Sequence, residues 1–185
     1  MNYGIYRPQL RKAPIRGVLF DMDGVVLDTE KLYCRFWREA AMALGYPMTV
    51  EQALGMRSLN AQAGQEKLES YFGPGVSREI MKDKRIELMD AYVNVHGVDS
   101  KPGIHALLDE LKRRGIKTAI TTSSPMDRVH RYLKPLGLLE KFDCLCSGRD
   151  VPHGTPGPHI YLHGAASVGF GQSECLAIEA SNAGV

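Results

Sequence analysis

The stretch VLFDMDGVVLDTE, residues 18–30, places two aspartates at the end of an apolar run. The segment GVLF at 17–20 has the length and apolar content of a buried strand, and Asp21 and Asp23 come directly after it. Alternation along an extended chain puts both side chains on one side of the backbone, where they raise each other's proton affinity unless a cation intervenes. We therefore expect a divalent metal site, and Mg²⁺ fits because it commonly takes one or two carboxylates.

Two carboxylates beside such a metal predict phosphoryl chemistry. One carboxylate can attack phosphorus as a nucleophile, while the other exchanges protons with the leaving group and the incoming water. Gly24 follows the second aspartate and lets the chain turn away close to a ligand. A purely structural alternative, in which the aspartates only cap a helix or form a turn, is disfavoured by the rest of the chain.

Composition indicates a globular protein of one domain with a sizeable insertion. The 185 residues are 44% hydrophobic, and a formal net charge of +2 gives no basic excess for binding nucleic acid or an anionic membrane. Residues 1–16 lack the apolar segment of a signal peptide, and no stretch approaches the roughly 18 apolar residues of a membrane helix. The four cysteines contain no C-x-x-C pair, so neither a disulfide framework nor a zinc site is expected. We expect a cytoplasmic protein with small-molecule partners.

Short apolar runs alternate with helical patterns, which predicts an α/β fold with a parallel sheet. Strands are predicted at 17–20, 116–120, 142–146 and 174–178. Two amphipathic helices are predicted between the later strands from apolar residues at helical spacing. These residues are Ile104, Leu107, Leu108 and Leu111 in the first helix, and Met126, Val129, Leu133 and Leu136 in the second.

The interval between the first two strands is too long for one crossover, and its helical pattern predicts an inserted all-helical cap. The evidence is a helix face formed by Leu32, Phe36, Ala40 and Leu44, a capping box beginning at Thr49, and a helix that starts at Ser77 and contains Met81, Leu88 and Tyr92. The predicted boundaries are 33–97 for the cap, 16–32 plus 98–185 for a Rossmann-like core, and 1–15 for an N-terminal extension. Hinges are expected near Leu32 and at 98–103.

The segment DMDGVVLDTE, followed by a cap-sized helical insertion, resembles the first motif of the haloacid dehalogenase superfamily. The resemblance is to the branch that holds beta-phosphoglucomutase and small-molecule phosphatases, and it extends from Arg16 to Val185. It implies a Rossmann-like parallel sheet with a helical cap, Mg²⁺ as cofactor and a small phosphorylated metabolite as substrate.

The same resemblance implies roles for individual residues. Asp21 would be the nucleophile that becomes phosphorylated, and Asp23 the general acid and base, whose backbone carbonyl also binds Mg²⁺. The hydroxyl of Thr122 and the backbone amides around Ser123 would hold the phosphate. Glu179 would bind the metal together with the two aspartates.

Two motifs depart from the family pattern. The third motif, usually GKPAPDIY, reads GTPGPHIY at 154–161, with Thr155 in place of the lysine that bridges nucleophile and phosphate. The fourth, usually EDSPAGV, reads EASNAGV at 179–185, with Ala180 in place of a metal-binding aspartate. Since one cation and one anion are both missing, the formal charge of the site with Mg²⁺ bound is unchanged. We expect a phosphomonoester hydrolase with impaired activity.

Two other functions remain open. A non-catalytic descendant would keep the fold and bind a phosphorylated ligand or a protein partner, and the altered motifs support it directly. A sugar phosphomutase is ranked lower because Tyr33 occupies the position of the mutase histidine. Arg149 and His153, in the loop before the third motif, could supply replacement positive charge.

The end of the sequence predicts a core that is truncated at its C-terminal side. Proteins of this branch usually continue past the fourth motif into a helix and a further strand, whereas this sequence stops at Val185. An exposed sheet edge would then favour self-association. His159 and His163 lack a third metal ligand and are expected at the surface, and Cys144 and Cys146 share a strand face and are expected in the core.

Overall fold

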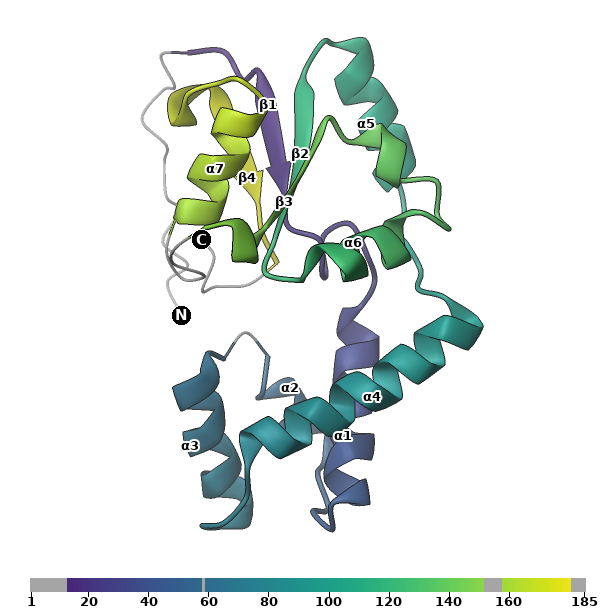
Figure 1. Cartoon of the computed structure of the whole chain (residues 1–185), viewed down its shortest axis with the longest axis vertical. Coiled ribbons are helices and arrows are strands. Elements are labelled where there is room, and N and C mark those ends of the chain that lie inside the picture. Colours follow the sequence, from purple (N-terminus) through teal and green to yellow (C-terminus); the bar gives the residue numbers. More distant parts are fainter. Residues whose placement is uncertain (1–12, 58, 152–157, 181–185) are drawn as a thin grey trace.

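Four parallel strands form the sheet of the computed structural model, which describes residues 13–57, 59–151 and 158–180 (Figure 1). The strands are β1 (Gly17–Phe20), β2 (Lys117–Thr122), β3 (Cys144–Ser147) and β4 (Cys175–Ile178). Their order is β3-β2-β1-β4, so β1 lies between β2 and β4. The predicted α/β fold is confirmed, and the strand positions agree with prediction to within two residues.

Successive side chains of β1 point to opposite faces of the sheet, and each face packs against its own layer of helices. Val18 and Phe20 pack in the main hydrophobic core with α5 and α6, whereas Leu19 packs on the opposite face with α7. These helices are α5 (Ile104–Arg113), α6 (Met126–Leu133) and α7 (His159–Ser167). A Cβ at Gly164 would lie 2.5 Å from Cγ2 of Thr121, so α7 approaches β2 closely because residue 164 has no side chain.

The described residues between β1 and α5 form four helices, which agrees with the predicted all-helical insertion. They are α1 (Glu30–Ala43), α2 (Val50–Leu54), α3 (Ala61–Phe72) and α4 (Arg78–His96). They enclose a hydrophobic cluster of their own, which includes Trp37, Leu68 and Met81. The capping box at Thr49 is confirmed, because its hydroxyl accepts from the amide of Gln52 at 3.2 Å. The exact cap boundaries, 33 and 97, stay a prediction.

Three residues depart from the predicted helix faces. Leu136 is predicted in the second core helix, but α6 ends at Leu133. Leu44 is predicted on the apolar face of the first cap helix, but α1 ends at Ala43 and Leu44 is 37% exposed. Leu107 lies in α5 as predicted but is 42% exposed, because the buried face is formed by Ile104 and Leu108. A short amphipathic pattern does not distinguish these edge positions from the centre of the apolar face.

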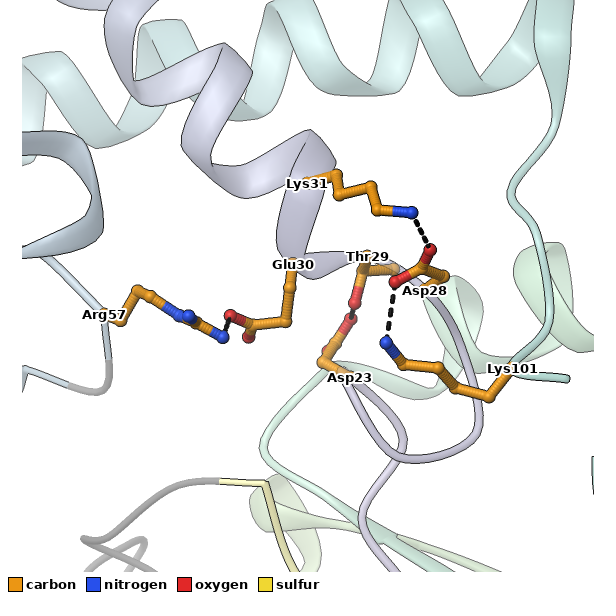
Figure 2. A network of polar contacts seen from close by, with 7 residues as sticks. All are labelled: Asp23, Asp28, Thr29, Glu30, Lys31, Arg57 and Lys101. Atoms are coloured by element: carbon orange, nitrogen blue, oxygen red, sulfur yellow. Dashed lines mark hydrogen bonds and ion pairs between the residues drawn. The ribbon is translucent and has the colours of Figure 1, made fainter. Parts of the chain in front are cut away.

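The two chain segments that connect core and cap are joined to each other. The amide of Asp28 donates to the carbonyl of Asp99 at 2.8 Å, and the amide of Lys101 donates to the carbonyl of Val26 at 2.8 Å. The Asp28 carboxylate also accepts from Nζ of Lys31 at 2.8 Å and from Nζ of Lys101 at 2.7 Å (Figure 2). The hinges expected in this region stay a prediction.

Replacing Asp28 with asparagine is expected to lower the free energy of unfolding by about 1 kcal/mol or less, because both of its lysine partners are partly in water. Hydrogen bonds from Lys101 and Lys31 hold the pKa of Asp28 below its usual range. The stabilisation is therefore present above the pKa of an unfolded aspartate, about 4, and is lost as the pH falls through the lower folded pKa. Urea denaturation from pH 7 downward should show this difference shrinking, and Asp99→Asn, an exposed neighbour, is the control.

Several smaller predictions concern the surface and the thiols. Within the three described ranges, no helix is long and apolar enough to cross a membrane. Cys146 is buried as predicted, and Cys144 is only half-buried. The strand β4 lies at one edge of the sheet, where Leu176 is 41% exposed. Self-association through this edge stays a prediction.

Candidate active site at the carboxyl ends of the strands

The predicted site residues lie together at the carboxyl-terminal ends of the parallel strands. The amide of Asp21 donates to the carbonyl of Ile178 at 2.9 Å, which places the end of β1 beside the segment leading to Glu179. The turn after β2 lies against the turn after β3, because a Cβ at Gly148 would be 3.2 Å from Cα of Ser123. Parallel strands in this order are what bring these distant residues together.

Gly24 makes the turn that follows the two aspartates. Its φ of 83° lies in the left-handed region, where a side chain is strained. A Cβ there would lie 3.0 Å from Cβ of Ala180 and 3.1 Å from Cγ of Glu30. The turn expected at Gly24 is confirmed, and Ala180 lies directly against this first loop of the site.

Asp21 and Glu179 place two carboxylates side by side. Burial is the largest influence on the pKa of Asp21, and the charges of Glu179 and Asp23 raise it further, well above its ordinary range. A hydrogen bond from the amide of Met22 to Oδ1 at 2.7 Å offsets only part of this effect. The repulsion predicted between Asp21 and Asp23 is present at Asp21, but the charge of Glu179 has the larger effect there, and a bound cation would relieve both.

Asp23 is held in a different environment from Asp21. Its Oδ1 accepts from the hydroxyl of Thr29 at 2.8 Å (Figure 2), and its Oδ2 accepts from the hydroxyl of Ser124 at 3.3 Å. Burial raises the pKa of Asp23, although these hydrogen bonds oppose the shift. An extended strand through Asp23 predicts that both aspartate side chains lie on one side of the backbone. This prediction is wrong, because β1 ends at Phe20 and the chain turns immediately afterwards.

The turn after β2 supplies the predicted phosphate-binding residues. Thr122 is buried and its Oγ1 accepts from the amide of Ser124 at 3.1 Å, which leaves the hydroxyl proton of Thr122 to be donated. Ser123 is exposed at the same turn. Because Ser124 also binds Asp23, this turn is fixed relative to the second aspartate.

The residues at the carboxyl-terminal ends of the strands fit Mg²⁺, the metal that the resemblance implies. Among residues 13–57, 59–151 and 158–180, no three His, Cys, Asp or Glu side chains form a metal-binding group. Asp21 and Glu179 nevertheless supply two adjacent carboxylates, and the charge of Glu179 raises the pKa of Asp21 after the larger effect of burial. Mg²⁺ commonly takes one or two carboxylates with water and phosphate oxygens. The side chain of Asp23 is engaged by Thr29 and Ser124, so its backbone carbonyl is the oxygen that it would offer.

Three residues that support the site were not predicted from the sequence. Thr29 and Ser124 orient Asp23, and the hydroxyl of Tyr161 on α7 donates to Oε2 of Glu179. Burial and the charge of Glu179 raise the pKa of Tyr161, so this hydroxyl stays protonated and remains a donor. Thr29 and Tyr161 lie in the quoted motifs DMDGVVLDTE and GTPGPHIY, and Ser124 directly follows Ser123 in the turn after β2. Only the fold shows which polar atom each of them meets.

Replacing Tyr161 with phenylalanine is expected to raise the Mg²⁺ concentration needed for half-maximal activity by about 10- to 100-fold, because Glu179 loses the donor that orients it. The check is an Mg²⁺ titration of phosphate release, repeated as direct Mg²⁺ binding by calorimetry. Tyr46→Phe, in the cap beside Phe72, is the matched control and should leave the titration unchanged. Equal Mg²⁺ affinity in all three proteins would show that Tyr161 does not position Glu179.

Residues 15–185 match the family model of haloacid dehalogenase-like hydrolases. The chain belongs to this family. The match confirms the resemblance read from the first motif and the prediction of a hydrolase.

Named relatives and solved structures agree with the haloacid dehalogenase-like assignment. A phosphorylated carbohydrates phosphatase of Thermotoga maritima is 30% identical over 171 residues, which cover 92% of this chain and 79% of that protein. The beta-phosphoglucomutase of Bacillus subtilis is 25% identical, and the match covers 92% of this chain and 77% of that protein. A crystal structure of a HAD family hydrolase from Deinococcus radiodurans, with bound phosphate and sodium, has a TM-score of 0.74 at 25% identity and covers 93% of this chain and 75% of its own.

Of the two residues that depart from the haloacid dehalogenase-like pattern, one lies within the described residues and the other lies outside them. Ala180 lies at the site, against Gly24. Thr155 and His153 lie outside the described residues, and Arg149 is exposed in the short turn after β3. The proposal that Arg149 or His153 replaces the missing lysine therefore stays a prediction.

Proposed function

We propose that this protein is a Mg²⁺-dependent phosphomonoester hydrolase that acts on small phosphorylated sugars through a phosphorylated Asp21. The observation that carries the proposal is that the carboxylates of Asp21 and Glu179 lie close together at the ends of two neighbouring strands, near the half-buried Asp23. The name of the Thermotoga maritima relative, a phosphorylated carbohydrates phosphatase, supports the substrate class.

In the first step, a carboxylate oxygen of Asp21 forms a bond to phosphorus while the bond to the leaving sugar oxygen breaks. The hydroxyl of Thr122 donates to a phosphate oxygen. Asp23 gives its proton to the leaving oxygen, and its raised pKa supports this acid role. Mg²⁺, when bound by Asp21 and Glu179, supplies positive charge that offsets the repulsion between the carboxylate and the phosphate.

In the second step, Asp23 takes a proton from a water molecule that attacks phosphorus, and the bond between phosphorus and Asp21 breaks. Inorganic phosphate leaves, and both aspartates return to their starting states. Thr29 and Ser124 contribute by holding the Asp23 carboxylate where it meets first the leaving oxygen and then the water.

We propose that turnover is slow. Loss of one preorganised stabiliser lowers turnover by about 10² to 10³, and loss of a metal ligand should exceed the roughly 10- to 100-fold effect of an outer-shell change. From a typical enzyme rate of about 10 s⁻¹, we expect about 10⁻³ to 10⁻⁴ s⁻¹.

The test is phosphate release from a panel of sugar and nucleotide monophosphates, with and without Mg²⁺, beside an Asp21→Asn control. Release that requires both Mg²⁺ and Asp21 is the expected result. Release that survives Asp21→Asn would eliminate the phosphoaspartate mechanism. If nothing is released above the control, the non-catalytic alternative replaces the hydrolase.

A hydrolase is favoured over a phosphomutase by the environment of Tyr33. Burial is the main cause that raises the pKa of its hydroxyl, so Tyr33 stays neutral and does not provide the titratable imidazole of a mutase. Free sugar is therefore expected as the product of a sugar 1-phosphate, and formation of the 6-phosphate isomer would contradict this.

A further inference from the structure

Ser147, at the end of β3, links the turns that follow β2 and β3. It is 1% exposed, and its Oγ donates to the carbonyl of Ser124 at 2.9 Å. The same oxygen accepts from the amide of Arg149 at 3.2 Å, so the hydroxyl is used both as donor and as acceptor. The two turns also meet through their backbones, because a Cβ at Gly148 would lie 3.2 Å from Cα of Ser123. The turn after β3 therefore supports the turn after β2.

Ser124, which accepts the hydrogen bond from Ser147, makes two contacts with residues of the proposed site. Its amide donates to Oγ1 of Thr122 at 3.1 Å, and its hydroxyl donates to Oδ2 of Asp23 at 3.3 Å. Thr122, Ser124 and Ser147 are all buried, and a buried polar group that loses its partner is costly to the fold. The position of the Ser124 backbone thus affects both the hydroxyl of Thr122 and the carboxylate of Asp23.

Ser147 also has a local role, which explains only part of its hydrogen bonding. It forms the capping box of the short 3-10 helix Gly148–Asp150, in which its amide donates to Oδ2 of Asp150 at 2.9 Å. Capping accounts for the amide of Ser147 and for the bond that its hydroxyl accepts. It does not account for the bond that the hydroxyl donates to Ser124, which joins residues 23 positions apart and leads to the site.

We propose that Ser147 is a positioning residue for the reaction and acts on Asp23 and Thr122 through the carbonyl of Ser124. Thr29 holds Oδ1 of Asp23, and Ser124 holds Oδ2, so a shift of the turn after β2 would rotate or displace the carboxylate. Displacing a reacting group by about 1 Å can lower a rate about 10²-fold, even when the change lies away from the chemistry.

This inference rests on the proposed function for the reaction that Ser147 serves. With the enzyme in excess over substrate, Ser147→Ala is expected to slow the release of sugar from glucose 6-phosphate by up to about 10²-fold. Release of nitrophenolate from p-nitrophenyl phosphate, which leaves without protonation, is expected to slow less. A loss of folded protein would affect both substrates alike, so the difference between them reports on Asp23.

A second measurement does not require turnover. Calorimetry with inorganic phosphate and Mg²⁺ is expected to show weaker phosphate binding by Ser147→Ala, because the hydroxyl of Thr122 is no longer held in place. Thr118→Val is the matched control, since Thr118 is a buried residue at the other end of β2 whose hydroxyl donates to the carbonyl of Lys141 at 3.5 Å. Asp150→Ala removes the other half of the capping box but keeps the hydroxyl of Ser147. Both controls are expected to keep their rates and their phosphate affinity.

Unchanged rates and phosphate affinity in Ser147→Ala would overturn the proposal, and so would an equal loss in Asp150→Ala. If thermal melting shows that Ser147→Ala does not fold, Ser147→Cys decides, because a thiol occupies a similar space but is a weak donor. Unchanged behaviour of that variant overturns the proposal. Weaker phosphate binding by Ser147→Ala, in a protein that releases no phosphate, would support the positioning role while rejecting the hydrolase.

Discussion

The double variant Thr155→Lys with Ala180→Asp is expected to release phosphate about 10³-fold faster than the natural sequence, or more. The lysine restores a cation between nucleophile and phosphate, an effect of about 10² to 10³ in turnover. The aspartate restores a metal ligand at a position that already lies against Gly24. The two changes together leave the formal charge of the site unchanged.

The single variant Ala180→Asp shows whether the balance of charges in the site affects turnover. Ala180→Asp alone adds a carboxylate beside Asp21 and Glu179, whose repulsion is already strong. It is expected to tighten Mg²⁺ binding while raising turnover far less than the double variant does. Initial rates at saturating Mg²⁺ and direct Mg²⁺ titration separate these effects. A double variant no faster than the natural sequence would mean that another group already compensates for the altered motifs.

Asp23→Asn is expected to slow hydrolysis of sugar phosphates by about 10² to 10⁴, the usual contribution of general acid–base catalysis. The loss should depend on the leaving group. With p-nitrophenyl phosphate, whose phenolate leaves without protonation, the variant is expected to give a burst of one nitrophenolate per enzyme and then a slow steady rate. The burst arises because the first step no longer needs an acid, whereas the attacking water still lacks its base.

Stability measurements distinguish this loss from unfolding. Burial raises the pKa of Asp23, so its ionisation in the folded protein disfavours the native state increasingly as the pH rises through that pKa. Asparagine cannot ionise, and Asp23→Asn is therefore expected to melt no lower than the natural sequence at pH 7. Asp28→Asn, in the same loop but outside the reaction, is the control for activity. Equal loss of activity in both variants would argue against a catalytic role for Asp23.

Much of the site could be predicted because its residues lie at strand ends, and the end of a strand can be recognised from the residue pattern of a single sequence. Asp21, Thr122 and Glu179 each follow an apolar run, and parallel strands place such positions at one edge of the sheet. The capping box at Thr49 was predictable for a similar reason, since its hydrogen bonds join residues three apart.

The supporting contacts were not predictable because they join residues far apart in the chain. Ser124 reaches Asp23 across 101 positions, and the hydroxyl of Tyr161 meets Glu179 across 18. Hydrophobic periodicity gives the face on which a side chain lies but not the atom that it meets. The same limit applied to Leu44 and Leu107, where the pattern did not reveal the edge of the apolar face.

The sequence by itself determined the strand that carries Asp21, the parallel α/β architecture, the helical insertion and the altered residues at 155 and 180. These are properties of local pattern and residue identity. Only the tertiary structure decided that the carboxylates of Asp21 and Glu179 lie close together, while the carboxylate of Asp23 accepts hydrogen bonds from Thr29 and Ser124. The physical reason is that these contacts join segments from the ends of different strands, which only the order of the strands in the sheet brings together and no periodicity within a segment encodes.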